Sequence, residues 1–434
     1  MGGRRSTDGD SETTIDQRSV SSHGIARRHA IAGRRTETSN RQYLLAARLT
    51  PLMIENVVIY VADSLRWDAL PSAVADRGVG FRTVAQSLFS APSFATLATG
   101  LYPPQHGVLD WHNRMPDGVE TLFELDGVDA GFWQAGEVAG HEIYPILRQS
   151  GNTALTDLNE PFVYLERNDD PHVPFGGTDA ASAEAYYTTR GGDWDRIREE
   201  YRRGAALSVE RFEDLLAELR ERGVLDDTLV VFTADHGELL GEGGEVGHTS
   251  PARPELAYVP TVFVHRNLSA DDFHADPESA IIEHVDVVAT VLGALGRSDA
   301  PATTGVDLLA EPRTREWGYN HADIVRNGRS MYAADSIWWP EGGYVYHRNR
   351  TAYRLGKALY GLTKGASRHS IRHRPLSLLR SYLRRRARFG TPPMAAEEAR
   401  ELLAEFHGQL STVDARTVEL DADVEETLQD MGYL

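Results

Sequence analysis

Residues 229–238 read Leu-Val-Val-Phe-Thr-Ala-Asp-His-Gly-Glu, and this stretch decides the fold. Its first four residues are continuously apolar, which is typical of a central parallel strand that is buried on both faces. Asp235 and His236 follow where that strand is expected to end. A long amphipathic helix is predicted over 197–222, because its apolar residues recur along one stripe. Helix, buried strand and polar strand end together indicate one unit of an α/β fold.

The alternation of strand-like and helix-like segments continues along most of the chain. Strands are expected at 56–61, 161–165, 227–234 and 258–265, and helices at 92–100, 197–222 and 285–295. This pattern predicts the α/β class, with a large, mainly parallel central sheet flanked by helices and a small C-terminal α+β subdomain. In such folds the functional side chains lie just beyond the carboxyl ends of the strands.

Three regions are predicted along the chain. Residues 1–50 carry nine arginines and five acidic residues with little hydrophobic periodicity, so we expect a disordered leader. Residues 52–310 are expected to form the catalytic α/β domain, and 311–434 a C-terminal subdomain. That subdomain is expected to hold an antiparallel hairpin, a basic helical segment at 342–396 and acidic helices in the tail.

The composition is acidic and poor in lysine. Of 434 residues, 64 are Asp or Glu and 45 are Lys or Arg, which gives a net charge of −19, and only two of the basic residues are lysines. An acidic surface of this kind stays hydrated when salt screens its charges, so we expect adaptation to a salty cytoplasm. A GC-rich genome that favours arginine codons is the alternative. Nucleic acid is not an expected partner of a chain with this charge.

The chain contains no cysteine, which excludes disulfides, thiolate metal sites, iron–sulfur clusters and cysteine nucleophiles. No apolar run reaches the roughly 18–20 residues that a membrane span requires. The arginine pairs near the N-terminus precede no apolar region of the kind that a secretory signal contains. A cytoplasmic location is therefore expected, either free or peripheral at the inner face of the membrane.

Polar side chains gather at the ends of the predicted elements. Asp63 follows the first predicted strand, and Asp235 and His236 follow the third. Carboxylates and an imidazole in such a set can bind one divalent cation. Ser90 precedes the first predicted helix, whose N-terminus stabilises negative charge. Cation, hydroxyl and helix terminus are what nucleophilic attack on a sulfate or phosphate ester requires.

Over about residues 54–310, the sequence resembles the sulfatase family of the alkaline phosphatase superfamily. Six segments occur in the family's order: Ser90-Ala91-Pro92-Ser93 with Thr99-Gly100, Gly100 to Val108, Asp170-Pro171-His172-Val173-Pro174-Phe175, Asp235-His236-Gly237-Glu238, Tyr258-Val259-Pro260 and His284-Val285-Asp286. Any one of these segments is a weak signal, whereas six in order are a strong one. The resemblance implies the α/β fold of that superfamily.

The resemblance also implies a set of site residues and a cofactor. One divalent metal, which oxygen and imidazole ligands allow to be Ca, Mg, Mn or Zn, is expected on Asp63, Asp235, His236 and Ser90. Ser90 is the expected nucleophile, either as the free hydroxyl or as formylglycine. His172 and His248 are expected to orient the ester or protonate the leaving group.

Several positions depart from the family pattern. Ser64 stands where the family has a second aspartate, and Phe94 stands where it has an arginine that helps to hold formylglycine. The family's lysine-bearing segment is missing near 131–140, with His141 as a loose substitute, and His248 is nearest to a later family lysine. These departures put formylglycine in doubt and leave more than one function open.

Metal-dependent cleavage of a sulfate ester through Ser90 is the expected function. The first alternative is a phosphodiesterase or a phosphoglycerol- or phosphoethanolamine-type transferase with unmodified Ser90. The second is a protein without catalysis that binds anionic glycans or lipids. The expected substrate is a sulfated or phosphorylated ester, carried on a glycan or a lipid.

The stretch 342–396 differs from the rest of the chain, because it contains 13 Arg and Lys and no acidic residue. Leu376, Leu379, Leu383 and Ala387 recur on one helical face with arginines beside them, which predicts a basic amphipathic helix. Such a helix contacts an anionic membrane. The alternatives are docking on the acidic catalytic domain through ion pairs, and RNA binding.

Overall fold

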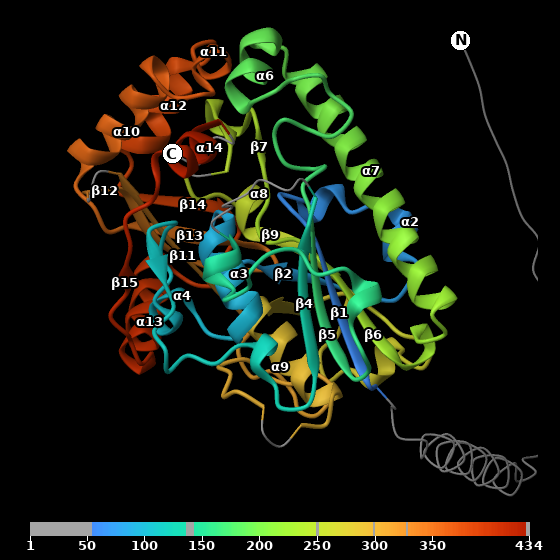
Figure 1. Cartoon of the computed structure of the whole chain (residues 1–434). Coiled ribbons are helices and arrows are strands. Elements are labelled where there is room, and N and C mark those ends of the chain that lie inside the picture. Colours follow the sequence, from blue (N-terminus) through green and yellow to red (C-terminus); the bar gives the residue numbers. More distant parts are fainter. Residues whose placement is uncertain (1–53, 136–142, 249–250, 298–299, 327–328, 431–434) are drawn as a thin grey trace, which may run out of the picture. The chain divides into compact units, whose positions relative to one another are not determined.

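A seven-stranded sheet forms the centre of the computed structural model, which describes residues 54–135, 143–248, 251–297, 300–326 and 329–430. Its strands are β1 (Asn56–Ala62), β2 (Val79–Val84), β4 (Asp129–Gln134), β5 (Phe162–Asn168), β6 (Thr228–Thr233), β9 (Tyr258–Val264) and β10 (Ile281–Glu283). In space they follow the order β10-β2-β9-β6-β1-β5-β4 (Figure 1). The leader predicted at residues 1–50 lies outside the described residues.

Strand β1 lies between two parallel neighbours. It pairs with β6 on one side and with β5 on the other, and β4 continues in parallel beyond β5. Every residue of β1 is buried, because helices cover both faces of the sheet. Strand β9 runs antiparallel to both β2 and β6, so the sheet is mainly rather than wholly parallel. The expected fold class is confirmed.

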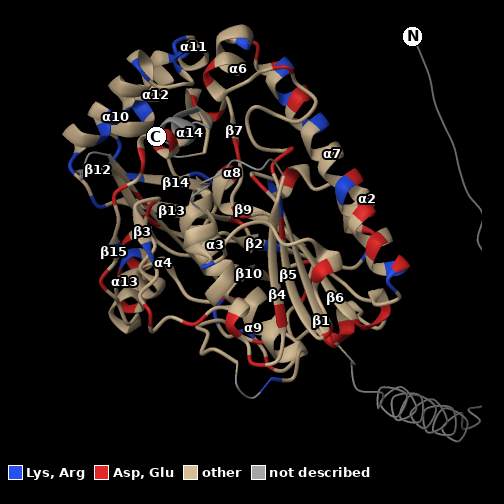
Figure 2. Cartoon of the chain, viewed as in Figure 1, with Lys and Arg blue, Asp and Glu red and all other residues tan. Residues whose placement is uncertain are grey.

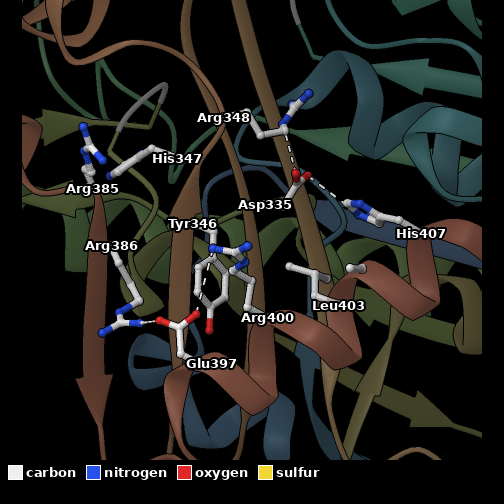
Figure 3. Close-up of a pocket in the computed structure, with 11 residues that line it drawn as sticks. Asp335, Tyr346, His347, Arg348, Arg385, Arg386, Glu397, Arg400, Leu403 and His407 are labelled. Atoms are coloured by element: carbon white, nitrogen blue, oxygen red, sulfur yellow. Dashed lines mark hydrogen bonds and ion pairs between the residues drawn. The ribbon is translucent and has the colours of Figure 1, made fainter.

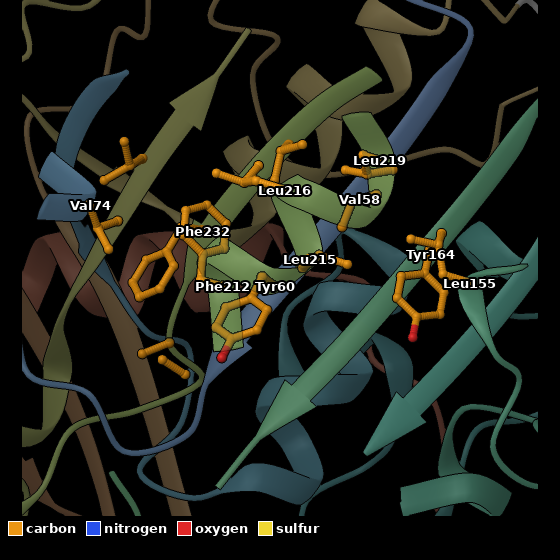
Figure 4. Packing of buried hydrophobic residues seen from close by; sticks show 14 of the residues in the cluster. Val58, Tyr60, Val74, Leu155, Tyr164, Phe212, Leu215, Leu216, Leu219 and Phe232 are labelled. Carbon is orange, nitrogen blue, oxygen red and sulfur yellow. The ribbon is translucent and has the colours of Figure 1, made fainter. Parts of the chain in front are cut away.

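Helix α7 (Trp194–Glu221) covers one face of this sheet. Its apolar stripe, which includes Phe212 and Leu215, packs on Tyr60 of β1 and Phe232 of β6 (Figure 4). The ring centroids of Tyr60 and Phe212 lie 5.3 Å apart. Removing one such buried leucine or aromatic side chain costs about 2–5 kcal/mol. The stripe predicted from the sequence therefore fixes the helix to the strands that carry the site.

Helices α3 (Ser90–Thr99) and α9 (His284–Ala294) pack against each other on the other side of the sheet (Figure 1). All ten residues of α3 are buried. The helix ends at Gly100, whose φ of 67° is a left-handed conformation that favours glycine. A Cβ at this position would lie 2.7 Å from Thr303 Cγ2. Because α3 is buried and Gly100 is closely packed, the helix is held in place. The position of its first residue, Ser90, is therefore fixed.

A second, four-stranded antiparallel sheet lies in the C-terminal part of the chain. It consists of β11 (Gly318–Arg326), β12 (Arg329–Trp339), β13 (Gly342–His347) and β14 (Arg386–Gly390). Hydrogen bonds join it to the loop after β2: His321 N donates to Gln86 O at 2.8 Å, Asn320 Nδ2 donates to Ala85 O at 2.7 Å, and Gln86 Nε2 donates to Tyr319 O at 3.4 Å. Helix α13 (Ala396–Gln409) packs on this sheet through Leu403. The boundary predicted at residue 310 stays a prediction.

The basic helix predicted to extend through Ala387 ends early. Helix α12 (Pro375–Leu383) stops at Leu383, and the next arginines enter strand β14, which pairs with β13. The prediction is wrong here because Arg384, Arg386 and Arg388 fit a two-residue repeat as well as a helical one. The edge of β13 offers backbone hydrogen bonds that select the strand.

The remaining elements are short or peripheral. They are η1 (Trp67–Ala69), α2 (Ser72–Ala75), α4 (Pro103–His106), β3 (Asn113–Arg114), η2 (Leu122–Glu124), α5 (Ile143–Ile146), η3 (Leu155–Asp157), α6 (Ala183–Arg190), η4 (Leu225–Asp227), β7 (Leu239–Leu240), η5 (Glu242–Gly244), β8 (Val246–Gly247), α8 (Pro254–Ala257), η6 (Ala270–Asp272), α10 (Thr351–Thr363), α11 (Arg368–Ile371), β15 (Arg416–Thr417) and α14 (Ala422–Asp430). Within the described ranges, no helix has the length and apolar character needed to cross a membrane.

Candidate active site

Three of the predicted metal ligands meet at the carboxyl ends of β1 and β6. Asp63 follows β1, and Asp235 and His236 follow β6, its parallel neighbour. One ligand atom from each of the three side chains lies within 4.8 Å of the other two. His236 Nε2 is 3.3 Å from Asp235 Oδ2 and 3.6 Å from Asp63 Oδ1. All three side chains are fully buried, so the cluster lies in a dry environment.

The hydrogen bonding of His236 prepares one ring nitrogen for a cation. Its Nδ1 lies 2.9 Å from the carbonyl oxygen of Gly237, which can only accept a hydrogen bond. The Nδ1 atom therefore carries the proton, and Nε2 presents its lone pair to the two carboxylates. Histidines that bind metals are commonly oriented in this way by a backbone carbonyl.

The cluster fits one divalent metal. Asp235 Oδ2 is buried and accepts no hydrogen bond from the residues that the structure describes, which is costly unless a cation faces it. Burial, followed by the charge of Asp63, raises the pKa of Asp235. Burial alone would also raise the pKa of Asp63, but Arg167 and nearby histidines hold it well below its usual range. Two carboxylates and an imidazole suit Ca, Mg, Mn or Zn.

Ser90 lies beside this cluster at the first position of α3. Its Oγ donates a hydrogen bond to Asp63 Oδ2 at 3.3 Å and lies 3.3 Å from His236 Nε2. The side chain is fully buried. The helix N-terminus places positive charge near this oxygen, and a metal held by the cluster would add to it, which favours the ionised form of the hydroxyl. The geometry suits both predicted roles of Ser90, as nucleophile and as metal ligand.

Ser64, in place of the family's second aspartate, is bound to the two carboxylates that remain. Its Oγ donates to Asp63 Oδ1 at 2.9 Å, and its backbone N–H donates to Asp235 Oδ1 at 3.1 Å. The residue has a φ of 66°, which is uncommon for serine, and Tyr201 of α7 holds its carbonyl by a 2.9 Å hydrogen bond. Ser64 thus orients the two carboxylates.

Sequence reasoning missed Arg167, at the end of β5. Its guanidinium is buried and binds Asp63 Oδ2 through Nε at 2.7 Å and Nη2 at 2.5 Å. It also lies over the ring of Phe94, 5.9 Å from the centroid. Phe94 occupies the position of the family's arginine, so a guanidinium is present here but comes from a strand instead of from α3. A charged pair, Glu166-Arg167, inside an otherwise apolar strand is the signal that could have revealed it.

The structure places His248 beside His236, and His172 beside His248. The ring of His248 lies 4.5 Å from that of His236 and 4.8 Å from that of His172, measured between centroids. Burial lowers the pKa of His248 to about 4 and that of His172 well below its usual value. Glu238 Oε2 lies 3.4 Å from His248 Nδ1, and burial raises the pKa of Glu238 to about 8. Both imidazoles are therefore uncharged at neutral pH and able to accept a proton.

Two further histidines lie in or near the family-like segments, His106 within Gly100 to Val108 and His141 next to 131–140. His106 binds Thr96 Oγ1 through Nε2 at 3.1 Å and accepts from Val108 N through Nδ1 at 3.1 Å, which is a structural role. His141 lies outside the described residues. Arg66 forms ion pairs with Asp68 at 2.6 Å and with Glu242 at 2.9 Å. Arg66 therefore fastens the loop after β1 to the segment that follows Glu238.

A cavity of about 620 Å³ lies in the C-terminal part, away from these side chains. Figure 3 shows Asp335 there between Arg348 and His407, and Glu397 between Arg386 and Arg400. The cavity shares no residue with the cluster around Ser90. Its charged residues largely satisfy one another, so it offers no reactive group comparable to Ser90.

Comparisons with known proteins identify the family of this chain. The family model named Sulfatase matches residues 146–297. The chain is 31% identical over 399 residues to the low-salt glycan biosynthesis sulfotransferase Agl7 of Haloferax volcanii, which covers 88% of this chain and 96% of the relative. The acidic, lysine-poor composition fits a relative from that organism.

Solved structures show the same fold. A 2-O GAG sulfatase is 15% identical with a TM-score of 0.52, covering 83% of this chain and 95% of its own. The phosphonate monoester hydrolase of Agrobacterium radiobacter is 16% identical with a TM-score of 0.52, covering 78% and 100%. This fold generally binds a divalent metal. The chain belongs to the sulfatase family of the alkaline phosphatase superfamily, whose enzymes act on sulfate or phosphate esters.

Proposed function

We propose that this protein cleaves a sulfate ester through unmodified Ser90 and passes the sulfuryl group to a hydroxyl acceptor on a glycan. One observation carries the proposal: Ser90 Oγ lies 3.3 Å from both Asp63 Oδ2 and His236 Nε2 in a buried cluster. The relative that spans nearly the whole chain is named a glycan biosynthesis sulfotransferase, which supports a sulfated glycan as product. Hydrolysis, the function expected from the sequence, is the same reaction with water as acceptor.

Arg167 is proposed to bind the sulfate group. Its guanidinium is fixed by Asp63 and by Gln134, whose Oε1 accepts from Nη1 at 3.1 Å. A planar guanidinium suits an oxyanion with several acceptor oxygens. In a buried site its charge is weakly screened and stabilises negative charge that develops on those oxygens. Arg167 thus replaces the family's basic residues that this chain lacks.

A metal held by Asp63, Asp235 and His236 would supply positive charge that lowers the pKa of a nearby hydroxyl. In the first half-reaction, Ser90 Oγ attacks sulfur, and the bond between sulfur and the leaving oxygen breaks. The Ser90 proton passes to an uncharged imidazole, for which His172 and His248 lie beside the cluster. The same imidazole then protonates the leaving oxygen.

The second half-reaction returns the serine to its starting state. The acceptor hydroxyl attacks the same sulfur and gives its proton to the imidazole. The bond between sulfur and Ser90 Oγ breaks, and Oγ takes the proton back. A serine sulfate has no second hydroxyl that could expel the group, so it persists until an acceptor arrives. This persistence favours transfer over hydrolysis.

We infer that Ser90 acts as the free hydroxyl and not as formylglycine. The arginine that helps to hold it in the family is Phe94 here, and the Phe94 ring lies under the Arg167 guanidinium. No hydrogen-bond donor extends from position 94 to the position of a hydrated aldehyde. The proposed reaction therefore uses the free Ser90 hydroxyl, and the mass of the Ser90 peptide tests this directly.

An ester panel on the purified, metal-loaded protein tests the proposal. An aryl sulfate and a bis-aryl phosphate are compared with and without a sugar acceptor, and both free sulfate and sulfated sugar are measured. We expect metal-dependent consumption of the aryl sulfate and a sulfated sugar as product. Faster turnover of the bis-aryl phosphate would favour the phosphodiesterase or phospho-transferase alternative. Ligand binding without turnover of either ester would favour the non-catalytic binder.

A further inference from the structure

Large apolar side chains are exposed mainly on one part of the surface. Among the described residues five are clearly exposed, and four of them lie on helices α10 and α12. These are Tyr353 and Leu359 of α10, exposed by 45% and 60%, and Leu376 and Leu383 of α12, exposed by 79% and 52%. Soluble proteins rarely gather exposed apolar side chains in this way unless a partner covers them.

The two helices present these side chains as one rigid pair. Helices α10 and α12 pack side by side (Figure 1), with Leu378 and Tyr382 buried on the inner face of α12. Arg354 of α10 is buried and donates to the carbonyl oxygens of Tyr382, at 3.1 Å, and of Arg384, at 3.3 Å. The exposed leucines of α12 therefore face outward from a helix whose position is fixed.

The same surface is basic, and two of its arginines have no acidic partner among the described residues. Figure 2 shows Lys and Arg positions, coloured blue, along α10, α11 and α12. Within 342–396, ion pairs to acidic residues are made by Arg348, Arg368 and Arg386. No acidic side chain of the described chain lies within ion-pair distance of Arg380 or Arg384, which flank the exposed leucines. Docking on the acidic catalytic domain through ion pairs, one alternative from the sequence, does not explain these two arginines.

We propose that the outer face of α10 and α12 docks this enzyme on an anionic membrane surface. Leucine and tyrosine side chains enter the boundary between headgroups and acyl chains, while the arginines beside them bind lipid phosphates. The rest of the molecule is acidic and is repelled by the same surface, so contact is confined to this face. In a cytoplasmic protein, the location expected from the sequence, this is the inner face of the membrane. This docking brings the site of the proposed function to substrates carried there.

Salt separates the two contributions to docking. The screening length is about 10 Å at 0.1 M salt and about 3 Å at 1 M, so the arginines act mainly at low salt. Burial of apolar side chains is not screened. For a protein adapted to salt, Leu376 and Leu383 should therefore carry most of the affinity, with Arg380 and Arg384 adding to it when salt falls.

Co-sedimentation of the full chain with phosphatidylglycerol or phosphatidylcholine vesicles, at low and high salt, tests the proposal. We expect L376S/L383S to lower partitioning onto phosphatidylglycerol about tenfold at both salt concentrations. R380Q/R384Q should lower it about tenfold at low salt only. The matched controls are V413S, which removes the exposed apolar side chain outside α10 and α12, and R202Q, which removes an exposed arginine of α7.

The proposal is overturned if the wild-type chain stays in solution with both vesicles, or if both helix variants partition like the controls. It is also overturned if L376S/L383S abolishes self-association or RNA binding while vesicle binding is unaffected. Turnover of a soluble aryl sulfate should be the same in L376S/L383S and wild type. Loss of vesicle binding with intact turnover, and intact vesicle binding without sulfate turnover, identify which of the two proposals has failed.

Discussion

Two charged regions of this molecule differ in the burial and pairing of their charges. In the cluster around Ser90 the charges are buried, and Asp63 is matched by Arg167 at 2.5 Å. On α12 and at the residue that follows it, the charges of Arg380 and Arg384 are exposed and have no acidic partner in the described chain. A buried ion without a partner is costly, whereas an exposed one is solvated by water. The first region is therefore built to act on a group enclosed within it, and the second to meet a partner outside.

The largest effect on turnover is expected in the buried cluster around Ser90. Ser90→Ala should reduce turnover of an aryl sulfate about a thousandfold or more, because the nucleophile is lost. Ser93→Ala is the matched control, since Ser93 is buried in the same helix. Steady-state kinetics with both variants measure the difference. Equal losses in the two variants would contradict the role given to Ser90.

Arg167→Met should lower both stability and catalysis. Loss of the guanidinium leaves Asp63 as an uncompensated buried charge, which costs about 3–5 kcal/mol in the metal-free protein. The control is Arg211→Met. Arg211 of α7 pairs at 2.7 Å with buried Glu166, which precedes Arg167 in β5, and this pair lies away from Ser90. Denaturant unfolding should show losses in both variants. A loss of kcat should appear only in Arg167→Met, and equal kcat in the two variants would make Arg167 merely structural.

Removal of the metal should have an intermediate effect on the stability of the fold. A metal that binds only the folded protein adds about 2.7 kcal/mol at 100 times its dissociation constant. Chelation should therefore lower the melting temperature, and adding back Ca, Mg, Mn or Zn singly should identify the metal that restores it. In Asp235→Asn the added metal should give no such rise. A rise equal to that of the wild type would remove Asp235 from the ligand set.

The smallest effect on folding is expected on the exposed face of α12. Leu376→Ser should change the free energy of unfolding by no more than about 0.5 kcal/mol, because the side chain is 79% exposed. Leu378→Ala, two residues away and buried, should cost about 2–5 kcal/mol. Denaturant unfolding of the two variants measures the contrast. Similar losses in the two variants would contradict the outward position of Leu376 and the burial of Leu378.

The strand ends could be predicted from the sequence because short-range patterns encode them. The apolar runs before Asp63 and before Asp235 define β1 and β6, and parallel pairing brings their ends together. The helix that begins at Ser90 was expected two residues later, but its closure at Gly100 was expected correctly, since few residues other than glycine adopt its φ. These features depend on local patterns of three to ten residues.

Long-range pairing explains what could not be predicted. Arg167 reaches Asp63 only because β5 pairs with β1, and no local pattern marks which strand lies beside which. Strand β14 forms because β13 presents a free edge, and the arginine spacing alone suits a helix equally well. The pairing of His248 with Glu238, ten residues earlier, depends on the turn formed by β7 and β8.

The central claim is that Ser90, unmodified, carries the sulfuryl group. The most direct test is the mass of the Ser90 peptide after the protein is incubated with an aryl sulfate, without sugar acceptor, and quenched in acid. We predict a peptide heavier by one sulfuryl group on Ser90, which disappears when a sugar acceptor is added before the quench. An unmodified Ser90 peptide throughout turnover, or a peptide with the mass of formylglycine, would contradict the account.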